Sequence, residues 1–172
     1  MKEPAVSIGL TNPKSTSNVG AVMRAAGCYQ VDAVFYTGTR YDRAVKLQTD
    51  TKSVQQTIPL SKVEDLLACC SVDTKLVCVE LVVGATPLPE FQHPEKALYV
   101  FGPEDGTISQ AIIDRADAVV YVPTVGCMNL AGSVNVLLYD RLAKSDLSMA
   151  NDELIRQSRD TNNRVKIRNV SN

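Results

Sequence analysis

Short apolar runs alternate with helical patterns along most of the chain. Five runs rich in β-branched and aromatic residues predict buried strands, at 6–10, 33–37, 75–81, 97–101 and 118–122. Residues 18–28 and 129–144 repeat apolar side chains at helical spacing, and Ser109 can cap a short helix that runs to about residue 116. Parallel strands need long crossovers, which these helices supply. The pattern predicts an α/β fold with a mainly parallel sheet and helices on both faces.

Three stretches follow neither pattern. Residues 38–57 are polar, and we expect part of them to be helical. The sequence Ser61-Lys62-Val63-Glu64 matches a capping box and predicts a helix that runs to about Cys70. Residues 84–94 contain three prolines and predict an ordered loop.

The composition changes near Ser148. Residues 148–172 contain five basic and three acidic residues among Asn, Ser and Thr, so this segment is basic while the rest of the chain is acidic. We therefore expect one domain over residues 1–147, followed by a basic tail over 148–172 that is disordered or forms a loosely attached helix. Such a tail can contact nucleic acid, although basic tails are often only solvated.

Overall composition excludes several classes of protein. Hydrophobic residues make up 45% of the 172 residues and the net charge is −1, which excludes a disordered or broadly polybasic chain. No apolar run approaches the ~18 residues of a membrane span, and Glu3 and Pro4 interrupt any signal peptide, so we expect a cytoplasmic protein. The five cysteines have no C-x-x-C spacing and His93 is the single histidine, so we expect reduced thiols and no metal site.

The helix predicted at 18–28 carries an unusual face. Its apolar stripe is centred between Val19 and Val22, whereas Gly20, Arg24 and Gly27 lie together on the opposite side. Each glycine costs a helix about 1 kcal/mol relative to alanine. Bare backbone around one arginine leaves room for an anionic or polar substrate. The alternative is a surface arginine on an amphipathic helix whose glycines serve close packing.

A turn with two carboxylates follows the strand at 97–101. The sequence Gly102-Pro103-Glu104-Asp105-Gly106 lies at the carboxyl end of this strand, where open α/β sheets bind ligands. It lacks the lysine of a Walker loop and the three-glycine fingerprint of dinucleotide binders. We expect it to bind a cation or to place Glu104 against Arg24, with a plain acidic turn as the alternative.

The third segment joins the strand at 118–122 to the longest predicted helix. Cys127 or Asn129 lies near the start of that helix, where free backbone N–H groups point outward. The helix is nearly apolar on every side from residue 128 to 138, which predicts either a homodimer interface or a deep central helix. Cys127 has no neighbouring histidine to activate it as a nucleophile, so we expect it to line a pocket.

These three segments, in this order and at these separations, resemble the three motifs of the SPOUT class of RNA methyltransferases. The SpoU–TrmH branch is most similar; it methylates ribose 2′-hydroxyls of tRNA or rRNA with S-adenosylmethionine. The matching positions are Asn18, Gly20, Arg24 and Gly27, then Phe101 to Glu104, then Val122 to Asp140. The resemblance covers about residues 5–145. It implies a C-terminal trefoil knot, a homodimer formed through the C-terminal helix, and the cofactor bound in the knot.

The resemblance also implies which residues form the site. Contacts with S-adenosylmethionine come largely from backbone groups, at Glu80, Leu81, Gly102, Val122, Cys127 and Met128, and Asn129 supports the same loop. In the family, the arginine of the first motif is assigned to deprotonating the ribose hydroxyl. A guanidinium is almost never a base, so we expect Arg24 to bind an RNA phosphate or the developing oxyanion, oriented by Glu104. Asn18 is expected to bind the ribose or its phosphate.

The expected partner is RNA, with neither DNA nor a membrane. Lys14, Arg40, Arg43, Lys46 and the basic tail are candidate phosphate contacts, and Arg24 is a further one. The small size and the M-N-L motif favour tRNA over rRNA. We expect no separate RNA-binding domain before the first strand.

Two positions depart from the family pattern. The glycine after Glu104 comes one place early, at Gly106, and Cys127 stands where the family usually has serine. A thiol is a weaker hydrogen-bond donor than a hydroxyl. Two alternatives therefore stay open: a knotted RNA-binding paralogue with weak or no activity, and a nucleotide-binding regulator with an ordinary doubly wound sheet.

Overall fold

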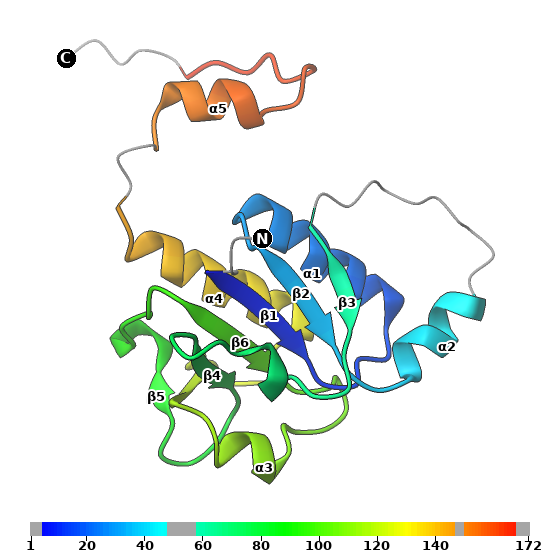
Figure 1. Ribbon diagram of the computed structural model, residues 1–172. Coiled ribbons are helices and arrows are strands. Elements are labelled where there is room, and N and C mark those ends of the chain that lie inside the picture. Colours follow the sequence, from blue (N-terminus) through cyan, green and yellow to red (C-terminus); the bar gives the residue numbers. More distant parts are fainter. Residues whose placement is uncertain (1–4, 48–57, 147–149, 168–172) are drawn as a thin grey trace.

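The computed structural model describes residues 5–47, 58–146 and 150–167. Seven strands form one sheet in the order β3-β2-β1-β6-β4-β7-β5, and every pairing is parallel (Figure 1). The strands are β1 Val6–Leu10, β2 Ala33–Tyr36, β3 Leu60–Lys62, β4 Lys75–Val79, β5 Thr86–Pro87, β6 Ala97–Phe101 and β7 Ala118–Tyr121. The helices are α1 Thr16–Cys28, α2 Arg40–Leu47, α3 Gln110–Ile113, α4 Leu130–Ala143 and α5 Asp152–Ser158, with short 3-10 helices η1 Leu67–Cys69 and η2 Leu88–Glu90.

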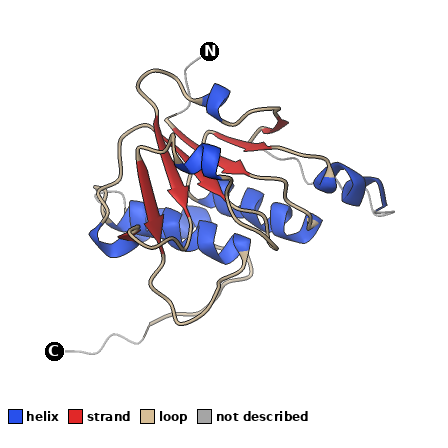
Figure 2. Cartoon of the chain, turned by 90° about the horizontal axis from the view of Figure 1, so that it is seen from below, coloured by secondary structure: helices blue, strands red, loops and turns tan. Residues whose placement is uncertain are grey.

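Helices cover both faces of the sheet, as the sequence predicted (Figure 2). On one face α1 and α4 pack together, with Val22 and Leu137 fully buried against Ile8 and Tyr99. On the other face α3 and η1 cover a smaller apolar cluster that contains Leu66. All five residues of β6, at the centre of the sheet, are buried, which explains why this strand is apolar throughout rather than alternating.

The predicted strands and the two long helices are confirmed, with shifted ends. The first helix begins at Thr16 rather than at Asn18, and Ser15 caps it: the Ser15 side chain accepts a hydrogen bond from the Asn18 N–H. The strand predicted at 75–81 ends at Val79, so the two residues that follow it are free to line a site. The loop predicted at 84–94 contains β5 and η2, and α2 accounts for the helical part of 38–57, whose residues 48–57 lie outside the described residues.

The helix predicted from the capping box at Ser61 is wrong. Ser61 and Lys62 belong to β3 and pair with Phe35 and Tyr36 of β2, and the next N–H, of Val63, donates to the Tyr36 carbonyl at 2.9 Å. Pairing with a neighbouring strand outweighs a local capping preference that is worth about 1 kcal/mol. Only the short helix η1 follows, at Leu67–Cys69.

The described part of the tail contains one short helix, α5. The Asn151 side chain caps it by accepting hydrogen bonds from the N–H groups of Glu153 and Leu154. Every described residue from 150 to 167 is exposed. None of the helices in the described part of the chain combines the length and the apolar character that a bilayer span requires.

Candidate functional site

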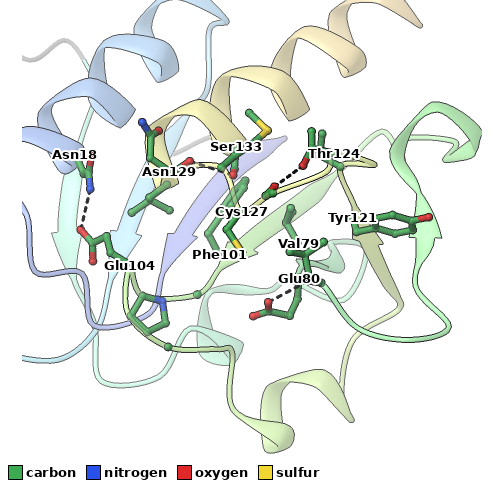
Figure 3. Close-up of a pocket in the computed structure, with 18 residues that line it drawn as sticks. Asn18, Val79, Glu80, Phe101, Glu104, Tyr121, Thr124, Cys127, Asn129 and Ser133 are labelled. Atoms are coloured by element: carbon green, nitrogen blue, oxygen red, sulfur yellow. Dashed lines mark hydrogen bonds between the residues drawn. The ribbon is translucent and has the colours of Figure 1, made fainter.

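A cavity of about 290 Å³ lies at the carboxyl ends of β4, β6 and β7, which are neighbours in the sheet (Figure 3). The loops that follow these three strands supply most of its lining, and Asn18 of α1 completes its rim. All seven residues predicted to contact the cofactor line it: Glu80, Leu81, Gly102, Val122, Cys127, Met128 and Asn129. Parallel strands explain this convergence, because their carboxyl ends meet at the same edge of the sheet.

The lining of the cavity is acidic. Glu80 and Glu104 are the charged residues among those that line it, and no lysine, arginine or histidine of the described chain does so. The rest of the lining is apolar or carries amide, hydroxyl and thiol groups. Such a lining suits a ligand with positive charge and disfavours phosphate groups.

The Glu104 carboxylate connects the second motif to the first. One oxygen, Oε1, accepts hydrogen bonds from the Ser15 N–H at 3.1 Å and the Asn18 side-chain amide at 3.2 Å, and Oε2 accepts from the Lys14 N–H at 3.0 Å. Burial alone would raise the pKa of Glu104, but hydrogen bonds from its own backbone, Lys14, Asn18 and Ser15 outweigh burial and hold this pKa below its usual value. Glu104 is therefore a charged acceptor that positions the start of α1.

Asp105, the next residue, forms ion pairs on the outside of the same turn. Arg40 at the start of α2 donates from both terminal nitrogens to one Asp105 oxygen at 2.9 Å, and the Lys14 ammonium donates to the other at 3.1 Å. Hydrogen bonds from Arg40 and then Lys14 lower the pKa of the Asp105 carboxyl. Sequence spacing gave no sign of these pairs, because their partners come from three separate segments.

The Glu80 side chain braces the other end of the turn. Its Oε2 accepts a hydrogen bond from the Ile108 N–H at 2.9 Å, and its Oε1 accepts from the N–H of Leu81 at 3.0 Å. A Cβ on Gly102 would lie 3.2 Å from Glu80 Oε2 and 3.3 Å from the Ile108 nitrogen, so the close packing here favours glycine. Glu80 therefore shapes the cavity through its side chain as well as through its backbone.

The third loop leads into α4. Asn129 caps this helix, its side-chain oxygen accepting from the Gly132 N–H at 2.6 Å, and Ser133 donates back to the Asn129 carbonyl at 3.1 Å. Cys127 is exposed and faces the cavity, as predicted. Thr124 and Ser133 also line the cavity; the sequence analysis missed both, although each lies within the third motif.

Arg24 lies outside the cavity lining. It is exposed on α1, together with Gly20 and Gly27, and it has no hydrogen-bond or ion-pair partner within the described residues. The expected contact between Glu104 and Arg24 is wrong for this chain, because Lys14, Ser15 and Asn18 occupy the carboxylate instead. An added Cβ at either glycine meets nothing within 4 Å, so packing inside this chain does not explain them.

The remaining candidate phosphate contacts divide into two groups. Lys14 and Arg40 are engaged with the acidic turn. Arg43 and Lys46 are exposed on α2, and neither has an ion-pair partner within the described residues.

A second polar cluster attaches the C-terminal half of α4 to the loop before β6. The buried His93 ring lies 2.8 Å from the Tyr99 hydroxyl and 2.9 Å from the Asp140 carboxylate. Arg141 donates to the Pro94 carbonyl, and Lys144 donates to the Leu88 carbonyl, both at 2.6 Å. This cluster contains the single histidine of the chain, and it lies away from the lining of the large cavity.

One side of α4 is buried and the other is not. Leu130, Val134 and Leu137 are buried, whereas Tyr139 and Leu142 are exposed, so α4 is not a fully enclosed central helix. A second, smaller hollow of about 160 Å³ adjoins the open side, lined by Leu88, Pro89, Val122, Pro123, Val136, Tyr139, Asp140 and Ala143.

Comparison with known proteins identifies a family. The model of the SpoU rRNA Methylase family matches residues 5–139. No curated protein matches the chain.

Solved structures share the fold. The SpoU methyltransferase AviRb from Streptomyces viridochromogenes, in complex with AdoMet, has a TM-score of 0.66 and 18% identity over 83% of this chain and 58% of its own. The A. aeolicus TrmH/SpoU tRNA modifying enzyme has a TM-score of 0.64 and 17% identity, over 83% of this chain and 75% of its own. A further solved structure, reported for the 2-OH methylation of C/U34 on tRNA, has a TM-score of 0.67 and 18% identity. The match covers 83% of this chain and 92% of that one. The chain thus spans under three fifths of AviRb.

Proposed function

The chain belongs to the SpoU rRNA methylase family, and on that premise we propose that it transfers a methyl group from S-adenosylmethionine to a ribose 2′-hydroxyl of RNA. The observation that carries the proposal is the cavity itself. Three loops that the sequence singled out converge there, and its charged lining residues within the described chain, Glu80 and Glu104, are both acidic.

The lining fits the cofactor by charge and by donor set. S-adenosylmethionine, when bound, supplies a methyl group that is attached to a positively charged sulfur. After transfer of the methyl group, the rest of the cofactor leaves as a neutral thioether. Two carboxylates, with no basic side chain among the described residues that line the cavity, suit this cation better than the phosphates of a nucleotide, so the lining argues against a nucleotide-binding regulator. We assign cofactor contacts to Glu80, Leu81, Gly102, Val122, Cys127 and Met128, largely through their backbone, with Asn129 supporting the loop.

We assign the positioning of RNA to Asn18 at the rim of the cavity and to Arg24, which lies outside its lining. Glu104 holds the Asn18 amide at the rim, where Asn18 can bind the ribose or its phosphate. Arg24, on the bare face of the same helix, supplies a permanent positive charge for an RNA phosphate or for the developing oxyanion. Glu104 thus acts on Asn18 rather than on Arg24. This arrangement orients a poor nucleophile, which is a large part of what such a reaction needs.

The open side of α4 supports a homodimer. Tyr139 and Leu142 are exposed next to an apolar hollow, and a second copy of α4 would cover them. The C-terminal trefoil knot that the resemblance implies is part of the proposal, and the contact of the end of α4 with the loop that precedes β6 is compatible with it. The division into a domain over 1–147 and a basic tail over 148–172, and a cytoplasmic location, remain predictions from the sequence.

Methyl transfer tests the proposal directly. Labelled S-adenosylmethionine is incubated with unmodified tRNA and with rRNA fragments, and label in the ribose fraction after nuclease digestion is the expected result, with tRNA the better substrate. Calorimetry of S-adenosylmethionine binding distinguishes the enzyme from the alternative, a knotted RNA-binding paralogue without activity. A catalyst must bind S-adenosylmethionine, and a pure RNA binder need not. Absence of both label and cofactor binding would refute the proposal.

A further inference from the structure

Arg40 reaches both carboxylates of the turn between β6 and α3. Its two terminal nitrogens, Nη1 and Nη2, each lie 2.9 Å from Asp105 Oδ1, and Nη2 lies 3.9 Å from Glu104 Oε2. Lys14 takes the second Asp105 oxygen. Arg40 is the better placed of the two cations, because its side chain is 31% exposed whereas that of Lys14 is 50% exposed. Ion pairs between fully solvated side chains contribute little, so the arginine contact is the stronger one.

The first turn of α2, which contains the backbone of Arg40, is fixed to the sheet. Two residues along α2, the Asp42 carboxylate accepts hydrogen bonds from the Tyr36 hydroxyl of β2 and the Lys62 ammonium of β3, both at 2.7 Å. The ring of Tyr41 packs edge-on against Tyr36 with centroids 5.0 Å apart. The first turn of α2 is therefore held by two strands, and Arg40 extends from a fixed point.

The turn that Arg40 contacts forms a wall of the cavity. Gly102, Pro103, Glu104 and Gly106 line the cavity, whereas Asp105 does not. Glu80 holds the end of this turn at Ile108, and the ion pairs of Asp105 hold its tip. Contacts at the end and at the tip of the turn, together with the hydrogen bonds that Glu104 accepts, thus define the position of this glycine-containing segment.

We propose that Arg40 is a positioning residue that acts through Asp105 on the Gly102–Gly106 turn, keeping Glu104 against Asn18, rather than a contact for RNA phosphate. The inference rests on the proposed function, since it concerns the shape of the same cavity. It replaces the expectation that Arg40 binds RNA. Two carboxylates already neutralise its charge, and a phosphate would have to displace them. Arg43, on the same helix and exposed, is the cation that α2 offers to RNA.

The affinities of four variants for S-adenosylmethionine and for tRNA distinguish a role of Arg40 in positioning the turn from a role in binding RNA phosphate. The variants are Arg40→Gln, Asp105→Asn, the double variant, and Arg43→Gln as a matched control on the same helix. If Arg40 positions the turn, both single variants weaken the binding of S-adenosylmethionine measured by calorimetry without RNA, by up to about tenfold. The double variant is no worse than either single variant, because both remove the same contact. Arg40→Lys restores part of the affinity, and Arg43→Gln leaves it unchanged.

RNA binding supplies the opposing outcome. A phosphate contact at Arg40 predicts that Arg40→Gln weakens tRNA binding and reduces the slope of log K against log salt by about 0.7–0.9. It also predicts that Asp105→Asn tightens tRNA binding, because the variant frees the arginine. Either result, with cofactor affinity unchanged, would overturn the inference.

Titration of the Asp105 carboxyl distinguishes a failure of this inference from a failure of the proposed function. In carbon-detected NMR, the pKa of the Asp105 carboxyl should rise in Arg40→Gln and stay constant in Arg43→Gln, since Arg40 is the main cause of its low value. An Asp105 pKa that does not respond to Arg40 overturns the inference. A different result overturns the proposed function, and the inference with it: the Asp105 pKa rises in Arg40→Gln, but the wild-type protein does not bind S-adenosylmethionine.

Discussion

The Asn18 side-chain amide donates a hydrogen bond to the Glu104 carboxylate at 3.2 Å, across 86 positions of sequence. The contact joins the first helix to the turn after β6. It forms because β1 and β6 are neighbours in the sheet, so that the loops leaving their carboxyl ends emerge side by side. Two residues that the sequence identified in separate motifs thus meet at the rim of one cavity.

Replacing Glu104 by glutamine should destabilise the fold and weaken cofactor binding. The carboxylate accepts three hydrogen bonds, and a glutamine NH₂ group would face at least one of those donors. Leaving a partly buried donor such as the Ser15 N–H without an acceptor costs up to about 1–3 kcal/mol. We expect a loss of that size in urea unfolding and a lower affinity for S-adenosylmethionine in calorimetry. Glu64→Gln, at an exposed site outside the cavity, is the control and should leave both quantities unchanged.

Arg24→Ala should strongly lower turnover while cofactor binding and stability persist. The side chain is exposed and has no partner within the described chain, so its removal should change the free energy of unfolding by less than about 0.5 kcal/mol. Loss of a charge that stabilises a developing oxyanion typically lowers rates by about 10²–10³-fold. Methyl-transfer kinetics test this, with Arg115→Ala, an exposed arginine outside the cavity, as control. Full turnover in Arg24→Ala would remove the assigned role.

Gly38→Ala should be strongly destabilising. Gly38 has a φ of +78°, and an added Cβ would lie 2.1 Å from the Asn12 side-chain oxygen. The left-handed backbone alone costs alanine about 1–2 kcal/mol, and the overlap adds to this cost. Gly20→Ala is the contrasting variant: its Cβ meets nothing within 4 Å, so the gain in helix propensity should stabilise the protein by about 1 kcal/mol. Equal effects of the two changes in urea unfolding would contradict this account.

Stability should fall when the pH drops below about 6.5. Burial lowers the pKa of His93 from 6.5, outweighing the hydrogen bond to Asp140. Between 6.5 and the lower pKa of the folded state, the unfolded chain binds more protons than the folded one, so acid favours unfolding. The stabilising contribution of neutral His93 is thus complete above about pH 6.5 and is lost as the pH falls through the window.

Thermal unfolding at about pH 7.5 and about pH 5.5 measures this effect. The chain contains a single histidine, so His93→Gln should remove most of the pH dependence in this range. The carboxylates of Glu104 and Asp140, whose pKa values are lowered, lose their contributions only at more acidic pH. An unfolding temperature independent of pH between these two values would show that His93 is not held neutral.

Cys127→Ser should preserve activity. Cys127 is exposed in the cavity lining, and a hydroxyl is a stronger hydrogen-bond donor than a thiol of similar size. We expect cofactor affinity equal to or tighter than that of the wild type, and a change in unfolding free energy within about 0.5 kcal/mol. Cys28→Ser, at an exposed site outside the cavity, is the control. A variant that binds the cofactor normally but loses turnover would indicate that the thiol itself takes part in the reaction.

Local patterns were sufficient for much of the fold and for the residues of the cavity. The apolar runs identified five of the seven strands, and helical spacing identified α1 and α4. Because all strands proved parallel, the segments after them had to share an edge, and seven of seven expected cofactor contacts line the cavity there. Helical spacing also placed Arg24 on an exposed face between two glycines, as the structure confirms.

Pairing across long sequence separations was decided only in three dimensions. The capping box at Ser61 has a favourable local free energy, yet its residues extend β2 as a strand, because strand pairing adds hydrogen bonds that no local pattern reports. Periodicity also could not show which cation meets which carboxylate. We expected Glu104 to lie against Arg24, whereas the strand order brings Asn18 and the start of α1 to Glu104, and brings Arg40 to Asp105. A sequence records the direction of a side chain relative to its own element, and the packing of elements then determines what that side chain meets.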